Sequence, residues 1–190
     1  GVQTCALPIF RDEVHRLSRL VSRMLDIARL QSGSMALSLQ RFDVSELLCR
    51  TLLSFETRVE SKALEVSVDL EEPQCYVSAD PDYISQVIYN LIDNAIKFSN
   101  EGAPLRLSVD KKGHLAYISV ENTGPGIPPE ELPYVFDRFH KTDKSRGMDR
   151  EGMGLGLYIV KVILNNHHQD IRAESDGGLT RFTFTLALSE

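Results

Sequence analysis

The chain has 190 residues, of which 42% are hydrophobic and 25% are charged, and its formal net charge is −6. This composition is sufficient for one domain with a hydrophobic core and excludes a disordered chain, while the lack of a lysine- and arginine-rich block argues against nucleic acid as a partner. The three cysteines are far apart, which excludes a disulfide framework and a zinc site, and no apolar run reaches the roughly 18 residues that cross a bilayer.

The N-terminal part divides into two segments. Residues 1–9, GVQTCALPI, resemble a translated sequencing adapter and are excluded from the fold prediction; a genuine N-terminal coil is the alternative. From Phe10 to Leu30, apolar residues recur in steps of three and four, and Gly33 supplies a stop signal. This pattern predicts one long amphipathic bundle helix, whose apolar stripe would favour self-association.

The next segment predicts a helix followed by strands. Asp43 or Ser45 can cap a helix that runs to about Lys62. The residues LEVSVDL, 64–70, alternate with period two, and CYVSAD, 75–80, reads as a short strand. A sheet is therefore expected to begin here.

A second helix is predicted over Asp80–Ser99, with Asp80 as its cap and Pro81 in the first turn. PLRLSVD and HLAYISVEN, separated by KKG, form a predicted hairpin. The segment from Asn122 to Gly156 is too long for a passive loop. A helix from Leu157 and two closing strands complete an α+β domain with helices packed on one face of the sheet.

The stretch NLIDNAIK places two amides and an amine on one helical face. Asn90, Asn94 and Lys97 lie at positions i, i+4 and i+7. Amide oxygens can bind Mg²⁺, which takes few protein ligands besides nucleotide phosphates. Hydrogen-bonded core or capping amides are the alternative for this stretch by itself.

Three further polar stretches lie in the long segment after Asn122. Directly after a strand, NTGPG supplies glycines that let a ligand approach the backbone, and EGMGLGL leads into a helix whose N-terminus suits a phosphate. Between them, HKTDKSRGMD contains Lys141 and could close over an anion, or is a solvated loop. A lone GxGxG pattern is weak evidence, since many helix starts contain it.

In this order and at these intervals, the stretches resemble the N, G1, F and G2 boxes of sensor histidine kinases, in the GHKL ATP-binding superfamily. The resemblance covers nearly all of Phe10–Glu190. It implies a two-layer α/β sandwich with a mixed sheet (the Bergerat fold) over 34–190, under a mobile lid. It also implies that 10–33 is the second helix of a dimerisation and phosphotransfer hairpin.

The resemblance further implies roles for individual residues with ATP and Mg²⁺ as cofactors. Asn94 corresponds to the main Mg²⁺ ligand with Asn90 as a second candidate, while Lys97 and Lys141 correspond to residues directed at phosphates. Asn90, Lys97 and Lys141 are therefore the candidate catalytic residues. The residues expected to contact or shape the nucleotide pocket are Phe98, Asn122, Gly124, Gly126, Ile127, Gly152, Gly154, Leu155 and Gly156.

Two positions depart from the family pattern. Asn122 stands where the family usually has an Asp that accepts a bond from the adenine amino group; an amide oxygen can still accept it, so weaker or altered base selectivity is expected. Strand alternation places the neighbouring Glu121 on the opposite face. His140 replaces an aromatic Tyr and is interpreted as a tolerated packing change.

The implied reaction is phosphoryl transfer to histidine. ATP-hydrolysing relatives have a Glu general base where this chain has Asn90, which has no basic lone pair. His15 lacks the acidic residue and the Pro that follow the family's acceptor, so it is not the expected acceptor, and this sequence is not expected to autophosphorylate. The parent protein would be a homodimer through its hairpin helices, cytoplasmic but anchored in the bacterial membrane, and would act on a response-regulator receiver domain. A degenerate nucleotide-binding or regulator-docking module and a GHKL ATPase are the alternatives.

Overall fold

A computed structural model describes residues 36–141 and 154–189 of the chain. The predicted helix at 10–33, residues 1–9 and Gly152 lie outside these ranges. All elements described below belong to one compact unit, Leu37–Glu190. Within the described ranges, no helix is both long enough and apolar enough to span a membrane.

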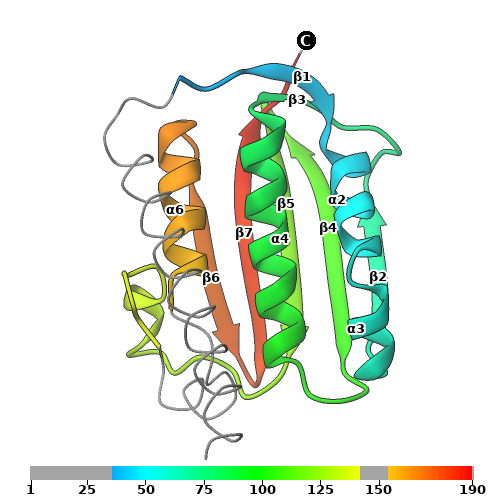
Figure 1. Cartoon of the computed structure of the whole chain (residues 1–190), viewed down its shortest axis with the longest axis vertical. Coiled ribbons are helices and arrows are strands. Elements are labelled where there is room, and N and C mark those ends of the chain that lie inside the picture. The colour runs from blue at the N-terminus through cyan, green and yellow to red at the C-terminus, as the bar shows by residue number, and fades with distance from the viewer. Residues whose placement is uncertain (1–35, 142–153, 190) are drawn as a thin grey trace, which may run out of the picture. The chain divides into compact units, whose positions relative to one another are not determined.

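A five-stranded mixed sheet forms one layer of the domain (Figure 1). In spatial order its strands are β2 (Glu65–Leu70), β4 (Pro104–Lys112), β5 (Leu115–Thr123), β7 (Leu179–Ala187) and β6 (Ile171–Asp176). The pairing of β2 with β4 is parallel and the other pairings are antiparallel. The predicted mixed sheet and the predicted β4–β5 hairpin are thus confirmed.

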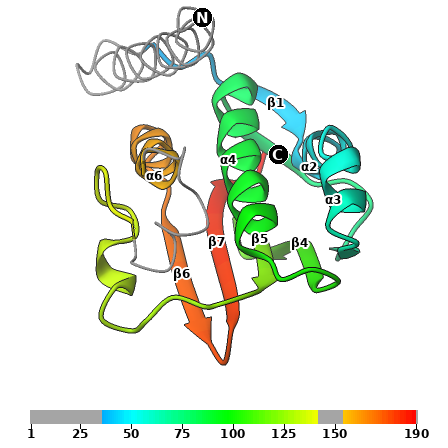
Figure 2. The same ribbon diagram turned by 60° about the horizontal axis from the view of Figure 1, so that its bottom comes forward.

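Helices α2 (Val44–Leu53), α3 (Glu56–Ser61), α4 (Pro81–Phe98) and α6 (Gly156–Asn166) all cover the same face of this sheet (Figures 1 and 2). Alternate residues of the strands point into this layer, so that Ile118 and Val120 of β5 are buried while Ser119 between them is not. These inward-pointing strand residues pack against the apolar stripe of α4, which includes the fully buried Ile88 and Leu91. The result is the predicted two-layer α/β sandwich.

The long helix α4 begins as the sequence predicts. The Asp80 carboxylate accepts hydrogen bonds from the backbone N–H groups of Asp82 and Tyr83, and Pro81 occupies the first turn. The backbone N–H of Asp80 also donates to His167 Nε2 at 3.1 Å. His167 caps the C-terminal end of α6, so this bond joins the start of α4 to the end of α6.

The predicted helix from Asp43 to Lys62 is wrong in one respect, because it is divided into α2 and α3. At the break, Phe55 leaves helical geometry and its side chain is buried, with its ring centroid 4.8 Å from that of Tyr89 on α4. The Ser54 hydroxyl donates to the Thr51 carbonyl at 2.6 Å, which helps end α2. Burial of one aromatic ring therefore overrides continuous helical periodicity.

The short strand β3 (Tyr76–Ala79) exists as predicted, but it lies outside the main sheet. It pairs antiparallel with β1 (Gln40–Asp43) in a separate two-stranded sheet. Strand β1 was not predicted from the sequence, because its four residues are too few to show a period. The long segment after β5 also contains a short 3₁₀ helix, η1 (Leu132–Tyr134).

Candidate functional site

Asn90 contains an unusual polar group on α4. Its amide nitrogen is buried and has no hydrogen-bond partner among the described residues. A buried amide without a partner costs free energy, so such groups are rare and commonly mark a ligand or water site. Asn94 lies one turn further along and is half-buried. This flank of α4 thus presents polar groups beside an apolar core.

The start of α6 lies against Asn90. The Asn90 Oδ1 atom is 3.8 Å from the position that a Cβ atom would take on Gly156, the first residue of α6. The structure therefore brings together two stretches that are separated by more than 60 residues. The free N–H groups and the dipole of the α6 N-terminus favour a negatively charged ligand.

Gly124 brings the end of β5 against the C-terminal end of α4. A Cβ atom on Gly124 would lie 1.9 Å from the Phe98 carbonyl oxygen, a distance that no side chain can occupy. On its other side, the Gly124 N–H donates to the Gly178 carbonyl at 2.8 Å. Glycine is therefore required at position 124, and the candidate residues Phe98 and Gly124 are neighbours.

Asn122, two residues earlier, is almost completely buried, with 4% of its surface exposed. In the pairing of β5 with β7 it lies opposite Thr180, which is also buried. The Thr180 hydroxyl lies 3.2 Å from the hydroxyl of Ser175, which accepts a 2.9 Å bond from the backbone N–H of Ile127. The polar residues at this end of the candidate site thus extend onto β6 and β7.

Thr180 and Ser175 were not among the residues predicted from the sequence. The signal for Thr180 was present, because TRFTFTLAL alternates and Thr180 shares the inward parity of Phe182 and Phe184. A hydroxyl on an otherwise apolar strand face needs a partner. Ser175 gave no comparable signal, since its contact with Ile127 depends on a turn geometry that the sequence does not specify.

Gly154, from the glycine-rich stretch before α6, packs against the segment that ends at Lys141. Gly154 has φ +65°, and a Cβ atom there would lie 2.6 Å from the His140 carbonyl oxygen. Phe139 donates its backbone N–H to the Gly154 carbonyl at 3.1 Å, and His140 Nε2 lies 2.8 Å from a Glu131 carboxylate oxygen. The candidate residues at both ends of the undescribed segment 142–153 are therefore close together.

Lys97 is engaged by a carboxylate on its own helix. Its ammonium lies 2.8 Å from Asp93 Oδ2, while Arg58 of α3 lies 2.6 Å from Asp93 Oδ1. Burial by itself would raise the pKa of Asp93, but hydrogen bonds from Lys97 and Arg58 outweigh it and lower that pKa. Asp93 is therefore ionised at neutral pH.

Lys62 holds the end of the same helix. Its ammonium donates to the backbone carbonyls of Ile96, Lys97 and Ser99 at 2.7, 2.9 and 3.1 Å. These are among the carbonyls that a helix C-terminus leaves without an intrahelical partner. Burial, with a smaller contribution from Arg58, lowers the pKa of Lys62.

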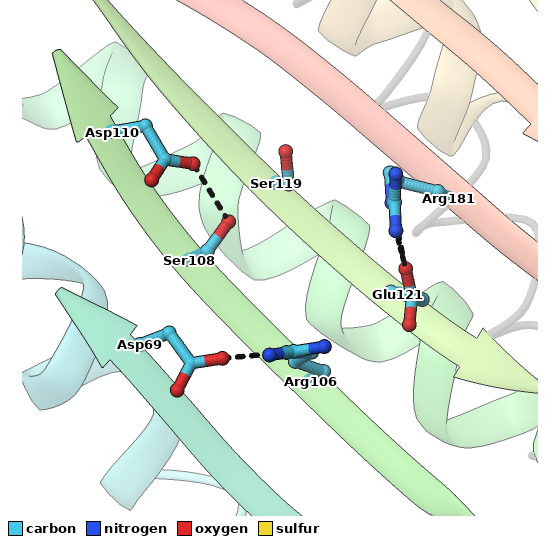
Figure 3. Close-up of a pocket in the computed structure, with 7 residues that line it drawn as sticks. All are labelled: Asp69, Arg106, Ser108, Asp110, Ser119, Glu121 and Arg181. Atoms are coloured by element: carbon cyan, nitrogen blue, oxygen red, sulfur yellow. Dashed lines mark hydrogen bonds and ion pairs between the residues drawn. The ribbon is translucent and has the colours of Figure 1, made fainter. Parts of the chain in front are cut away.

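The opposite face of the sheet contains a separate polar depression, formed by side chains of β2, β4, β5 and β7 (Figure 3). Glu121 points into this depression and binds Arg181, whose Nε lies 2.6 Å from the carboxylate. The predicted placement of Glu121 on the face away from Asn122 is confirmed. Glu121 therefore cannot take the place of Asn122 on the side of the sheet that the helices cover.

The described residues contain no cluster of three or more His, Cys, Asp or Glu side chains that could hold a metal ion. A cation at this site would depend on amide oxygens and on the oxygens of a bound ligand. Mg²⁺ commonly binds in this way, through one or two protein ligands and substrate phosphates. The donors on α4 fit such an ion.

Residues 79–190 match the family of histidine kinase-, DNA gyrase B- and HSP90-like ATPases. The chain belongs to this family. The matched range contains α4, the glycines that line the site and four of the five strands of the main sheet. The resemblance inferred from the motifs is confirmed.

Similar proteins place the chain among the histidine kinases of this family. Sensor histidine kinase WalK of Bacillus subtilis is 35% identical over 187 residues, which are 97% of this chain and 30% of WalK. The structure of full-length ShkA in complex with AMPPNP has a TM-score of 0.83 at 26% identity, over 100% of this chain and 39% of that one. Histidine kinase ThkA in complex with response regulator protein TrrA has a TM-score of 0.77 at 23% identity, over 100% of this chain and 52% of ThkA, and shows the shared fold.

These findings identify the described domain as the ATP-binding catalytic domain of sensor histidine kinases. The chain spans about a third of the length of WalK.

Proposed function

We propose that this domain binds Mg²⁺ and ATP between α4, the Gly124 turn and the start of α6, and supplies the γ-phosphoryl group for transfer to a histidine. The buried, unpartnered amide of Asn90 next to Gly156 carries this proposal. It needs a hydrogen-bond acceptor, and Gly156 beside it has no side chain that would fill the space. A phosphate at the α6 N-terminus would satisfy both requirements.

The residues divide between the two ends of the nucleotide. Asn94 and Asn90 would offer oxygens to Mg²⁺, and Lys97 and Lys141 would face phosphates. When bound, Mg²⁺ would neutralise charge on the phosphates. The base would pack on Phe98, Ile127 and Leu155, with Asn122 accepting a hydrogen bond from the adenine amino group. Gly124, Gly126, Gly154 and Gly156 would shape the pocket, with Gly152 as a further member.

Transfer to histidine fits the site better than hydrolysis. Asn90 stands where a hydrolase needs a general base, so a water molecule would not be activated there. A neutral imidazole is already a nucleophile and needs no such base. The in-line attack of its nitrogen on the γ-phosphorus would break the bond to the β,γ-bridging oxygen and release ADP.

The wider assignments follow the family. We propose that the parent protein is a cytoplasmic kinase, anchored to the membrane, that dimerises through the hairpin to which 10–33 would belong. We also propose that it passes the phosphoryl group to an aspartate of a response regulator, as ThkA is in complex with such a protein. These steps use parts that lie beyond the described domain.

Asn122 favours a second candidate function. If its amide cannot recognise adenine, the domain would be a regulator-docking module that does not bind nucleotide productively. The two candidates differ in one observable property, which is specific binding of an adenine nucleotide.

Calorimetric titration of the chain with a non-hydrolysable ATP analogue tests both candidates. We expect binding that depends on Mg²⁺ and that is stronger than binding of the GTP analogue. The Asn94→Ala variant should lose the Mg²⁺-dependent part of the affinity, while Asn165→Ala, an exposed asparagine at the far end of α6, should bind as the wild type does.

No binding of either nucleotide by folded protein would favour the docking module. Binding that is unchanged in Asn94→Ala would contradict the role assigned to that residue. Steady release of phosphate from ATP by the isolated chain would instead indicate a hydrolase.

A further inference from the structure

Asp93 connects two cations that come from different helices. One carboxylate oxygen is 2.6 Å from Arg58 Nη1 on α3, and the other is 2.8 Å from Lys97 Nζ on α4. The Arg58 side chain also lies over the Phe55 ring, with 5.2 Å between the guanidinium carbon and the ring centroid. Both oxygens of Asp93 and the position of Arg58 are thus defined by several contacts.

Lys97 stands between two flanks of α4. With a rotation of about 100° per residue, Asp93 lies about 40° to one side of Lys97, and Asn94 lies about 60° to the other side. The Asp93 flank faces α3, as the contact with Arg58 shows. The Asn94 flank belongs to the candidate phosphate side. The Lys97 ammonium is therefore close to an anion on one side and beside the proposed site on the other.

The charges of Asp93, Lys97 and Arg58 together determine how strongly Lys97 would attract a phosphate. Asp93 and Lys97 alone would form a neutral pair, and a nearby carboxylate would also repel a triphosphate. With Arg58 bound to the same carboxylate, the three groups have a net charge of +1. The Lys97 charge is then no longer cancelled by Asp93.

We propose that Arg58 is a positioning residue for nucleotide binding: it neutralises Asp93, so that Asp93 orients Lys97 without cancelling its charge toward the phosphates. This inference rests on the proposed nucleotide site. It assigns to α3, which contributes no residue to the family motifs found in the sequence, a role in setting the affinity for the triphosphate.

A brace between α3 and α4 is the competing explanation, and it makes a different prediction. A brace would change stability and would affect the binding of charged and uncharged ligands equally. Lys62 is an example of such a brace, since its partners among the described residues are backbone carbonyls. Charge neutralisation by Arg58 would affect triphosphates and leave adenosine unchanged.

The test is a charge cycle on the full chain, measured as the ratio of affinities for AMPPNP with Mg²⁺ and for adenosine. In Arg58→Met this ratio should fall about five-fold, as expected for one partly exposed charge, and the loss should shrink in high salt. Arg58→Lys keeps the charge and should retain most of the ratio. The double variant Arg58→Met/Asp93→Asn has the original net charge and should return to within about two-fold of the wild type.

Arg50→Met is the matched control, because it removes an exposed arginine from α2 in the same helical layer. It should leave the ratio unchanged. An equal loss of affinity for both ligands in Arg58→Met, or no recovery in the double variant, would overturn the inference while leaving the nucleotide site in place. If the wild type bound neither ligand, the proposed function itself would fail, and this inference with it.

Discussion

Gly124 is the residue whose replacement has the most direct structural consequence. Its hypothetical Cβ atom would collide with the Phe98 carbonyl at 1.9 Å. The backbone fixes the position of a Cβ atom and the carbonyl oxygen is itself a backbone atom, so neither can rotate away. We expect Gly124→Ala to cost about 2 kcal/mol or more of folding free energy and to abolish nucleotide binding. Urea denaturation and calorimetric titration measure the two effects.

The control for this prediction is Gly177→Asn. Gly177 has a positive φ of +57°, which Gly124 does not, but its hypothetical Cβ atom meets nothing within 4 Å, and Asn tolerates this backbone conformation. It should cost less than about 1 kcal/mol. If the two variants were equally stable, the close packing of Gly124 against α4 would be refuted.

Asn122 determines how the site would recognise its base. Replacing it by Asp supplies a charged acceptor for the adenine amino group, and charge-assisted hydrogen bonds are stronger than neutral ones. We expect Asn122→Asp to strengthen binding of the ATP analogue about five-fold, or about 1 kcal/mol, and to increase discrimination against the GTP analogue. Glu121→Gln, on the opposite face of β5, should change neither. Equal effects of the two substitutions would contradict the placement of Asn122 and Glu121 on opposite faces of the sheet.

At the scale of single elements, α4 depends on its N-cap residue, Asp80. The Asp80 side chain accepts from the N–H groups of Asp82 and Tyr83, and its second oxygen accepts from Ser38 at 2.9 Å. We expect Asp80→Ala to lower the free energy of unfolding by about 1–2 kcal/mol, measured by urea denaturation. Asp80→Asn keeps an acceptor oxygen and should lose less. Equal losses would show that the carboxylate charge, rather than capping, matters.

The contact between α3 and α4 makes stability depend on pH. The folded-state pKa of Asp93 is lower than its unfolded value, so its ionised form stabilises the folded protein. This contribution is fully present above the unfolded pKa of about 4 and is lost as the pH falls through the lower folded pKa. Between about pH 5 and pH 3, the wild type should therefore lose more stability than Asp93→Asn, as measured by thermal unfolding. Parallel curves for the two proteins would contradict the pKa shift.

Most elements were predictable from the sequence, and the failures share a cause. The Asp80 cap and Pro81 identified the start of α4 because those signals are local. The division between α2 and α3 depends on Phe55 packing against Tyr89, a contact between distant residues. The pairing of β3 with β1 rather than with the main sheet is another long-range choice that four residues cannot encode in a pattern.

At the scale of the whole molecule, the sheet has one apolar face and one polar face, and adjacent residues of β7 should respond differently. Phe182 is 3% exposed and points into the helical layer, while Arg181 pairs with Glu121 on the open face. Phe182→Ala should cost about 3–5 kcal/mol, and Arg181→Met less than about 1 kcal/mol with nucleotide binding unchanged. Denaturant unfolding compares them, and similar costs would refute the two-layer arrangement.

For the candidate site as a whole, the sequence offered candidate residues but not their contacts. Order and spacing of the polar stretches made Asn90, Gly124 and Gly156 candidates, because the family pattern fixes their types, and their roles stay predictions. The sequence could not show that Lys97 is held by Asp93 and Arg58, since α3 lies outside the motifs. A contact between a residue of a sequence motif and a residue elsewhere in the domain depends on the folded structure, so the sequence pattern does not predict it.

The hydrogen bond from Asp80 to His167 has a mechanical consequence for this domain. It joins α4 and α6 at the ends that lie away from Gly156 and Phe98. A fixed point at one end of two neighbouring rods permits mainly rotation about that point. Any widening between α4 and α6 would therefore be smallest at His167 and larger near Asn90 and Gly156. The two helices would separate by rotation about their joined ends.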